Sequence, residues 1–157
     1  MDKMPNSKTK PRTTKGKSPV WVSVVVPVYN EVKNVPLLHE KIKAAMASTK
    51  HKWELILVDD GSSDGSLQAM EVLAARDRKH TRVVALRRNF GQTAAISAGI
   101  DYSTGEIIVL MDGDLQNDPA DIPKLLAEIE KGFDVVSGWR KYPKDNFITR
   151  TLPSMIA

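Results

Sequence analysis

The 157-residue chain contains no cysteine, which excludes disulfide bonds, thiolate nucleophiles and zinc–thiolate sites. Its apolar stretches all fall short of the ~20 residues that a membrane-spanning helix needs. The first residues lack the apolar segment of a signal peptide. From these absences we expect a cytoplasmic protein without a transmembrane segment.

Two familiar phosphate-binding patterns are also missing. No Gly-x-Gly-x-x-Gly follows the first predicted strand, and no Gly-x-x-x-x-Gly-Lys-Ser/Thr occurs anywhere. A dinucleotide-binding fold and a P-loop ATPase are therefore disfavoured. The three histidines, His39, His51 and His80, are scattered over predicted helices or their ends, where we expect surface residues rather than ligands.

The positive charge is confined to one end of the chain. The net charge is +4, but residues 1–20 hold six basic side chains against Asp2 alone, so the rest of the chain sums to −1. This distribution argues against a nucleic-acid partner. The composition of residues 1–20 predicts a disordered basic tail, which either contacts anionic lipid or is simply solvated. The solvated alternative is the favoured one.

From Trp21 onward, strand and helix patterns alternate. β-branched and apolar runs predict strands over residues 22–28, 54–58, 83–86, 106–111 and 134–138. Apolar spacings of three and four predict helices over about 32–48, 67–77 and 122–129, and an Ala-rich stretch predicts another over 92–102. The alternation predicts an α/β domain over residues 21–140, with a mostly parallel, doubly wound sheet.

Polar residues follow the end of every predicted strand. In parallel sheets, ligands bind outside the carboxyl ends of the strands, so these residues share one rim. The strand-end segments are 29–31, 59–62, 87–91, 112–114 and 139–140. We therefore expect a ligand site at this rim.

The sharpest signal on the rim is Asp112-Gly113-Asp114. Two carboxylates that follow a buried strand can converge on Mg²⁺ or Mn²⁺, which prefer oxygen ligands and leave positions open for substrate phosphates. The alternative is an ordinary solvated turn. Gln116 offers a further oxygen nearby, whereas Asp118 precedes a proline and fits a helix-capping role better.

A second acidic pair, Asp59-Asp60, ends the second predicted strand. A carboxylate at this position can accept a hydrogen bond from a nucleobase or a ribose hydroxyl. The pair could also be a charged loop, but mutual repulsion of adjacent carboxylates favours a bound ligand or cation. Arg140, also on the rim, could neutralise a diphosphate.

Five segments in this order and spacing resemble family 2 glycosyltransferases. They are PVYNE (27–31), LILVDDGSSDGS (55–66), RRNFGQTAAISAGID (87–101), VLMDGDLQNDP (109–119) and DVVSGWR (134–140). The similarity is greatest to polyprenyl-phosphate hexosyltransferases, namely dolichyl-phosphate mannose synthases and undecaprenyl-phosphate glucosyltransferases. It covers residues 22–156 and implies a GT-A-type nucleotide-diphospho-sugar transferase fold.

The resemblance also implies a donor site. Pro27, Tyr29 and Glu31 match the loop that holds the nucleoside of a UDP- or GDP-hexose. Asp59 and Asp60 match the pair of which one member binds the base.

The resemblance further implies a metal and phosphate site. Asp112, Asp114 and Gln116 match the positions that hold Mg²⁺ or Mn²⁺ and, through it, the donor diphosphate. Asp114 and Arg140 are the implied catalytic residues, and Arg140 matches a basic residue that reaches the donor or acceptor phosphate. Arg150 matches a contact to the acceptor phosphate.

The implied reaction is metal-dependent transfer of a hexose, with inversion, from the nucleotide sugar to a polyprenyl phosphate. Such an enzyme works at the cytoplasmic face of a membrane, with the membrane surface or a membrane protein as partner. A phosphate acceptor is ionised at neutral pH, because its second pKa is about 6, so little general-base help is needed.

Full-length members of the resembled family continue beyond this chain's last residue. We therefore expect residues 141–157 to begin an incomplete acceptor and membrane-side region, so that the chain supplies the nucleotide-sugar half of the site. Two alternatives remain open. One is a family 2 enzyme with a polysaccharide or other non-lipid acceptor, and the other is a nucleotide-sugar binder without full activity.

Overall fold

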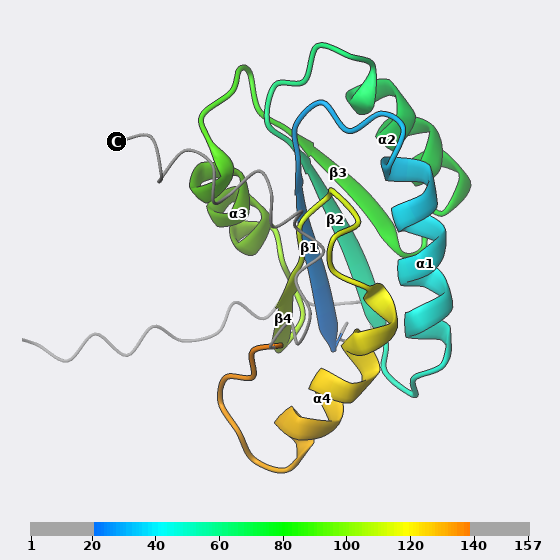
Figure 1. The fold of residues 1–157 in the computed structure, drawn as a ribbon, viewed down its shortest axis with the longest axis vertical. Helices are drawn as coiled ribbons and strands as arrows, with labels where there is room; N and C mark the ends of the chain where they lie inside the picture. Colours follow the sequence, from blue (N-terminus) through cyan, green and yellow to red (C-terminus); the bar gives the residue numbers. More distant parts are fainter. Residues whose placement is uncertain (1–20, 139–157) are drawn as a thin grey trace, which may run out of the picture. The chain divides into compact units, whose positions relative to one another are not determined.

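The computed structural model describes residues 21–138 of the chain. In this range the elements follow one another in the order β1 (Val22–Val28), α1 (Val35–Ala47), β2 (Trp53–Asp59), α2 (Ser66–Arg76), β3 (Thr81–Ala85), α3 (Gln92–Asp101), β4 (Ile107–Leu110), the 3₁₀ turn η1 (Pro119–Asp121) and α4 (Ile122–Glu130) (Figure 1). The strands and helices α1 to α3 lie in one compact unit, and a second unit that begins at Asp121 contains α4. No helix between residues 21 and 138 is long and apolar enough to cross a bilayer.

The described strands form one parallel sheet in the order β3-β2-β1-β4. β1 and β2 pair along their whole lengths, from Val22 opposite Trp53 to Val28 opposite Asp59. Both strands are almost entirely buried and mostly apolar, because helices cover both of their faces. The chain moves outward from β1 to β2 and β3 and then returns to the other side of β1 as β4. The direction of winding therefore reverses between β1 and β4, where ligands bind in sheets of this type.

Helices pack on both faces of the sheet, as the doubly wound prediction requires. α3 lies on one side of β1 and β2, with α1 and α2 on the other (Figure 1). Ala95 of α3 packs with Val25, Ile56 and Val58 in one buried cluster. At Gly99 a Cβ atom would lie only 2.3 Å from Cγ1 of Val25, so the absence of a side chain lets α3 approach the sheet closely.

A buried carboxylate fixes the amino ends of the strands, opposite the predicted rim. Glu54 accepts hydrogen bonds from Ser23 Oγ at 2.7 Å and from the backbone N and Oγ1 of Thr104 at 2.8 Å, and Arg82 pairs with its second oxygen. Burial alone would raise the pKa of Glu54, but these hydrogen bonds and the Arg82 charge outweigh it and hold the pKa below its ordinary value. The cluster joins three strands and the segment that enters β4.

Two sequence predictions are wrong. Residues 134–138 form no strand, and Val135 is 85% exposed. A strand needs a neighbour for its backbone hydrogen bonds, and local β-propensity does not supply one. His39 is buried instead of lying on the surface, with Nε2 3.0 Å from Thr81 Oγ1. It follows Val35 by one helical turn and so lies on the buried face of α1, where burial lowers its pKa.

Candidate functional site

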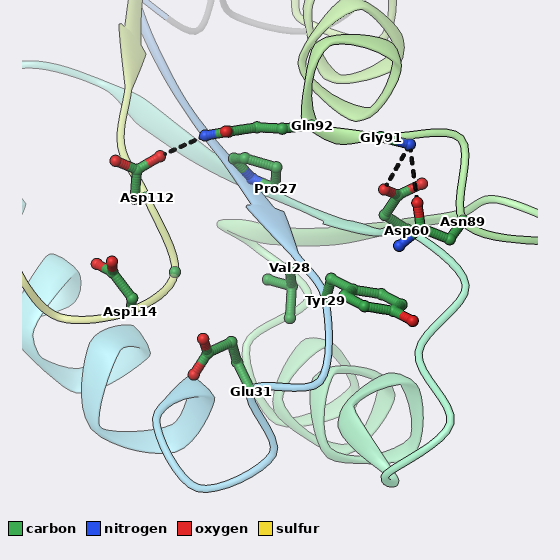
Figure 2. A pocket seen from close by; sticks show the side chains of 11 residues that line it. Pro27, Val28, Tyr29, Glu31, Asp60, Asn89, Gly91, Gln92, Asp112 and Asp114 are labelled. Carbon is green, nitrogen blue, oxygen red and sulfur yellow. Dashed lines mark hydrogen bonds between the residues drawn. The ribbon is translucent and has the colours of Figure 1, made fainter. Parts of the chain in front are cut away.

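A cleft of about 370 Å³ lies at the carboxyl ends of β1 and β4, at the switch point of the sheet (Figure 2). Its volume is in the usual range for small-molecule sites. All of its lining residues belong to the first compact unit. They are Pro27, Val28, Tyr29, Glu31, Asp60, Asn89, Gly91, Gln92, Asp112, Gly113 and Asp114.

Asp60 forms one side of the cleft and is almost fully buried, at 3% exposure. Its two carboxylate oxygens accept hydrogen bonds from the backbone N–H groups of Phe90 at 2.8 Å and Gly91 at 2.9 Å. Gly91 has φ +94°, a conformation that favours glycine. Asp60 therefore joins the end of β2 to the loop that enters α3, and it also lines the cleft.

Asp59 is equally buried but has a different role. Its carboxylate accepts a hydrogen bond from the backbone N–H of Ser62 at 3.2 Å, which closes the turn after β2. Asp59 is not among the residues that line the cleft. Of the acidic pair predicted to contact a base, Asp60 is thus the member that reaches the cleft.

The loop after β1, which carries Tyr29, is tied to the loop after β2. Asn30 has φ +55°, and its backbone N–H donates to Ser62 Oγ at 3.0 Å. Its side-chain Oδ1 accepts from the backbone N–H of Ser63 at 2.9 Å. These bonds hold the loop so that the Tyr29 side chain, 49% exposed, stands at the mouth of the cleft (Figure 2).

A second pair of bonds fixes the start of the helix α1 region. The backbone N–H of Glu31 donates to Ser66 Oγ at 2.8 Å, and that of Val32 donates to Asp64 Oδ2 at 3.1 Å. Ser66 in turn donates to Asp64 Oδ1 through both its N–H and its hydroxyl, and these hydrogen bonds lower the pKa of Asp64. Four bonds thus join the loop after β1 to the loop after β2, and we call them the loop clasp. They are the bonds donated by the backbone N–H groups of Asn30, Glu31 and Val32 and the bond from the N–H of Ser63 to Asn30 Oδ1.

Asp112 and Asp114 form the opposite side of the cleft. Asp112 Oδ1 accepts a hydrogen bond of 2.7 Å from Nε2 of Gln92, the first residue of α3. Asp114 Oδ1 accepts from the backbone N–H of Gln116 at 2.9 Å, which closes a turn. Gly113 lies between them, where a Cβ would be 3.1 Å from the Pro27 carbonyl oxygen, so this loop passes directly against β1.

The cleft is acidic. Its lining contains four carboxylates, from Glu31, Asp60, Asp112 and Asp114, and no lysine or arginine. Glu31, Asp112 and Asp114 lie on one side of the opening and Asp60 lies on the other (Figure 2). Within residues 21–138, no three acidic or histidine side chains converge as a complete metal site. Two carboxylates nevertheless fit Mg²⁺ or Mn²⁺, which are held by one or two carboxylates while water and substrate phosphates complete the shell.

Most of the predicted site residues meet in this cleft. The lining includes six of them: Pro27, Tyr29, Glu31, Asp60, Asp112 and Asp114. Asp59 and Gln116 are not part of the lining, and Arg140 and Arg150 lie outside the described residues. Asp118 takes the capping role expected of it, since its Oδ1 accepts from the backbone N–H of Ala120 in η1.

The other five lining residues were not predicted as site residues, namely Val28, Asn89, Gly91, Gln92 and Gly113. Asn89 and Gly91 belong to a predicted strand-end segment, and their place on the rim was the available signal. Gln92 is the first residue of α3, and its spacing from Asp112 carries no recognisable pattern.

The doubly wound parallel sheet and the cleft at its switch point place this protein in the class of α/β ligand-binding folds. Residues 23–156 match the family model described as Glycosyl transferase family 2, and the chain belongs to that family.

The curated relatives include enzymes whose names describe the transfer of a sugar to a polyprenyl phosphate. The chain is 50% identical over 137 residues to the dodecaprenyl-phosphate galacturonate synthase of Rhizobium johnstonii, covering 87% of this chain and 40% of that protein. It is 42% identical over 135 residues to the undecaprenyl-phosphate 4-deoxy-4-formamido-L-arabinose transferase of Proteus mirabilis, covering 86% of this chain and 41% of that protein. The chain thus spans about two fifths of the length of these relatives.

Solved structures support the GT-A fold. A mannosyltransferase, PcManGT, from Pyrobaculum calidifontis, in complex with GDP-Man and Mn²⁺, aligns with a TM-score of 0.50 and 29% identity, over 62% of this chain and 28% of that one. S. aureus TarS residues 1–349, in complex with UDP-GlcNAc, aligns with a TM-score of 0.59 and 24% identity, over 78% of this chain and 38% of that one. The predicted GT-A-type α/β fold is confirmed.

Proposed function

We propose that this protein is a glycosyltransferase that moves a hexose from a nucleotide sugar to a polyprenyl phosphate. The observation that carries the proposal is the acidic cleft at the switch point, with Asp60 on one side and Asp112 and Asp114 on the other. The names of the two curated relatives support the lipid-phosphate acceptor. The nucleotide sugars in the neighbouring structures support the donor class.

The nucleoside of the donor would bind beside Asp60. Uracil and guanine both carry an N–H next to a carbonyl group, and a buried carboxylate is a strong acceptor for such an N–H. Asp60 keeps acceptor capacity, because a carboxylate has about four lone-pair sites and two are used by Phe90 and Gly91. Pro27, Tyr29 and Glu31 line the adjoining part of the cleft and would contact the rest of the nucleoside.

The diphosphate would lie near Asp112 and Asp114. These residues, with Gln116 in the same loop, would hold Mg²⁺ or Mn²⁺. Such a cation supplies charge stabilisation to the nucleoside diphosphate leaving group. The negative lining of the cleft would repel a diphosphate on its own, so both carboxylates serve binding by retaining a cation rather than by touching phosphate directly.

In the transfer step, an oxygen of the acceptor phosphate forms a bond to the anomeric carbon while the bond from that carbon to the diphosphate oxygen breaks. The leaving group keeps the electron pair, and attack from the opposite face inverts the anomeric centre. The acceptor is already ionised and needs no strong base. No histidine lines the cleft within the described part of the chain. Arg140 and Arg150 are the proposed contacts to the phosphates, at the cytoplasmic face of a membrane.

Nucleotide binding tests the donor site. UDP or GDP at 100 times its Kd should stabilise the folded protein by about 2.7 kcal/mol in a thermal-shift series with Mn²⁺. A chelator should abolish most of this effect, and Asp114→Asn should reproduce the loss. Asp118→Asn, in the same loop but outside the cleft, is the matched control. Equal affinity with and without metal would contradict the metal assignment.

Lipid extraction tests the acceptor. The protein is incubated with a radiolabelled nucleotide sugar and a short-chain polyprenyl phosphate, and the label in the lipid phase is counted. Transfer into the lipid phase supports the proposal. Transfer to a polysaccharide acceptor instead would favour the non-lipid alternative, and donor binding without transfer to either would favour a binder without full activity.

A further inference from the structure

One side chain connects the two sides of the cleft. Gln92 extends from the first turn of α3, and its Nε2 donates a 2.7 Å hydrogen bond to Asp112 Oδ1 (Figure 2). The residue before it, Gly91, is bound through its N–H to Asp60. A continuous path therefore runs from the Asp60 carboxylate through Gly91 and Gln92 to the Asp112 carboxylate.

The base of Gln92 is held firmly. The N–H groups of Ala94 and Ala95 both donate to the Gly91 carbonyl oxygen, which sets the first turn of α3. At Gly99 the helix is in close contact with Val25 of β1. The Gln92 side chain thus starts from a fixed point relative to the sheet, and its amide can hold the Asp112 carboxylate in one orientation.

The chemistry of an amide suits this position. A lysine or arginine donor would also orient Asp112, but it would neutralise the carboxylate and repel a cation. Glutamine donates to a single oxygen and leaves the negative charge in place. Oδ2 accepts a longer hydrogen bond, 3.4 Å, from Nδ2 of Asn117, another neutral amide, so each carboxylate oxygen keeps a lone pair available as a ligand. Metal-ligating carboxylates are commonly oriented by such neighbouring hydrogen bonds.

We infer that Gln92 is a positioning residue that orients Asp112 for cation binding and so couples the nucleoside side of the cleft to the diphosphate side. This inference rests on the proposed function. Gln92 acts through Asp112, and it needs no contact with the nucleotide for this role.

Two variants separate positioning from charge. Gln92→Met keeps the length of the side chain and removes the donor, whereas Gln92→Lys keeps a donor and adds a positive charge beside Asp112. Thr93→Ala, the exposed next residue of α3, is the matched control. Bound Mn²⁺ is followed by electron paramagnetic resonance at saturating UDP and, separately, GDP. Metal-free binding of UMP and GMP is followed by calorimetry.

Removing the hydrogen bond to a metal ligand typically costs 10- to 100-fold in metal affinity. We expect Gln92→Met to raise the Mn²⁺ half-saturation about 10-fold, because the bond is open to solvent, and Gln92→Lys to raise it more. Thr93→Ala should match the wild type, and both it and Gln92→Met, which add no charge, should bind the nucleoside monophosphates unchanged.

Three results would overturn the inference. An unchanged Mn²⁺ half-saturation in Gln92→Met would show that the orientation of Asp112 does not depend on Gln92. If Gln92→Met weakened metal-free binding of UMP and GMP as much as it weakened Mn²⁺ binding, Gln92 would be a direct nucleotide contact. A wild type that binds UDP and GDP without any Mn²⁺ dependence would overturn the metal part of the proposed function itself, and the wild-type measurement alone distinguishes that failure from the other two.

Discussion

Replacing Asp60 by asparagine tests whether one carboxylate both builds the cleft and binds the ligand. Asp60 offers one oxygen to the N–H of Phe90 and the other to the N–H of Gly91. Asparagine keeps one acceptor oxygen and puts an NH₂ group where the second was. Leaving one partly buried N–H without its acceptor costs about 1–3 kcal/mol.

The surroundings of Asp60 place the cost at the lower end of this range. The N–H of Gly91 has a second acceptor, Asn89 Oδ1, at 3.0 Å, whereas the N–H of Phe90 donates to Asp60 Oδ1. The asparagine oxygen should therefore turn toward Phe90 and leave Gly91 to Asn89. We expect Asp60→Asn to lower the free energy of unfolding by about 1 kcal/mol.

This reasoning predicts coupling between the two side chains. Asn89→Ala alone should be mild, because Asp60 still accepts from Gly91. The double variant should lose at least 0.5 kcal/mol more than the sum of the singles, since neighbouring groups that share a partner couple by about 0.5–3 kcal/mol. Urea unfolding of the four proteins measures the cycle. Additive losses would refute the shared-acceptor argument.

The same variant tests recognition of the base. If Asp60 accepts a hydrogen bond from the nucleobase, Asp60→Asn should weaken UMP or GMP binding about 10-fold, which corresponds to about 1.4 kcal/mol. Asp59→Asn, which alters a buried carboxylate outside the cleft lining, is the matched control and should leave nucleotide affinity near the wild-type value. The opposite ranking would assign the base contact to Asp59.

Two further predictions concern stability. The pKa of Glu54 is below its ordinary value in the folded protein, so its contribution to stability is present above the unfolded-state pKa and is lost as pH falls through the folded-state pKa. Glu54→Gln should therefore destabilise the protein at pH 7, and the urea midpoint of this variant should fall less steeply toward acid pH than that of the wild type. An equally steep fall at acid pH would contradict this. At Gly61, φ is +71° and a Cβ would lie 2.4 Å from the Arg88 carbonyl carbon, so Gly61→Ala should cost more free energy of unfolding than the ~1–2 kcal/mol of a left-handed alanine alone. Gly65→Ala, with φ +96° and only one distant neighbour, measures that backbone cost by itself. Equal losses of the two variants in urea unfolding would show that the contact with Arg88 adds no cost.

The sequence predicted the central strands well because their signal is local. β1 is found over residues 22–28 as expected, and β2 extends the predicted 54–58 by one residue at each end. Mostly apolar runs with β-branched residues, such as these, form strands where both faces become buried. The run at 134–138 has the same local character and forms no strand, because pairing depends on a neighbour that the run itself does not encode.

From the sequence, the location of the site at the carboxyl-end rim of the sheet was predictable, but the contacts between its side chains were not. Strand ends gave the positions of Asp60, Asp112 and Asp114, and parallel topology brought them together. The choice between Asp59 and Asp60 depends on sheet register, since Asp59 is the last residue of β2 paired with Val28. The bond from Gln92 to Asp112 joins the first turn of α3 to the loop after β4, 20 residues along the chain, and no spacing rule signals a contact of that kind.

The loop clasp affects when conformational entropy is lost. Its four bonds order the segment from Asn30 to Val32 against the loop after β2 as the chain folds, before any ligand arrives. Immobilising each rotamer-rich side chain on binding costs about 0.5–1.5 kcal/mol, and part of that cost is met during folding instead. A ligand that enters on this side therefore finds a surface of fixed shape. Substitutions that loosen the clasp should weaken its affinity through entropy, with every atom that touches the ligand still in place.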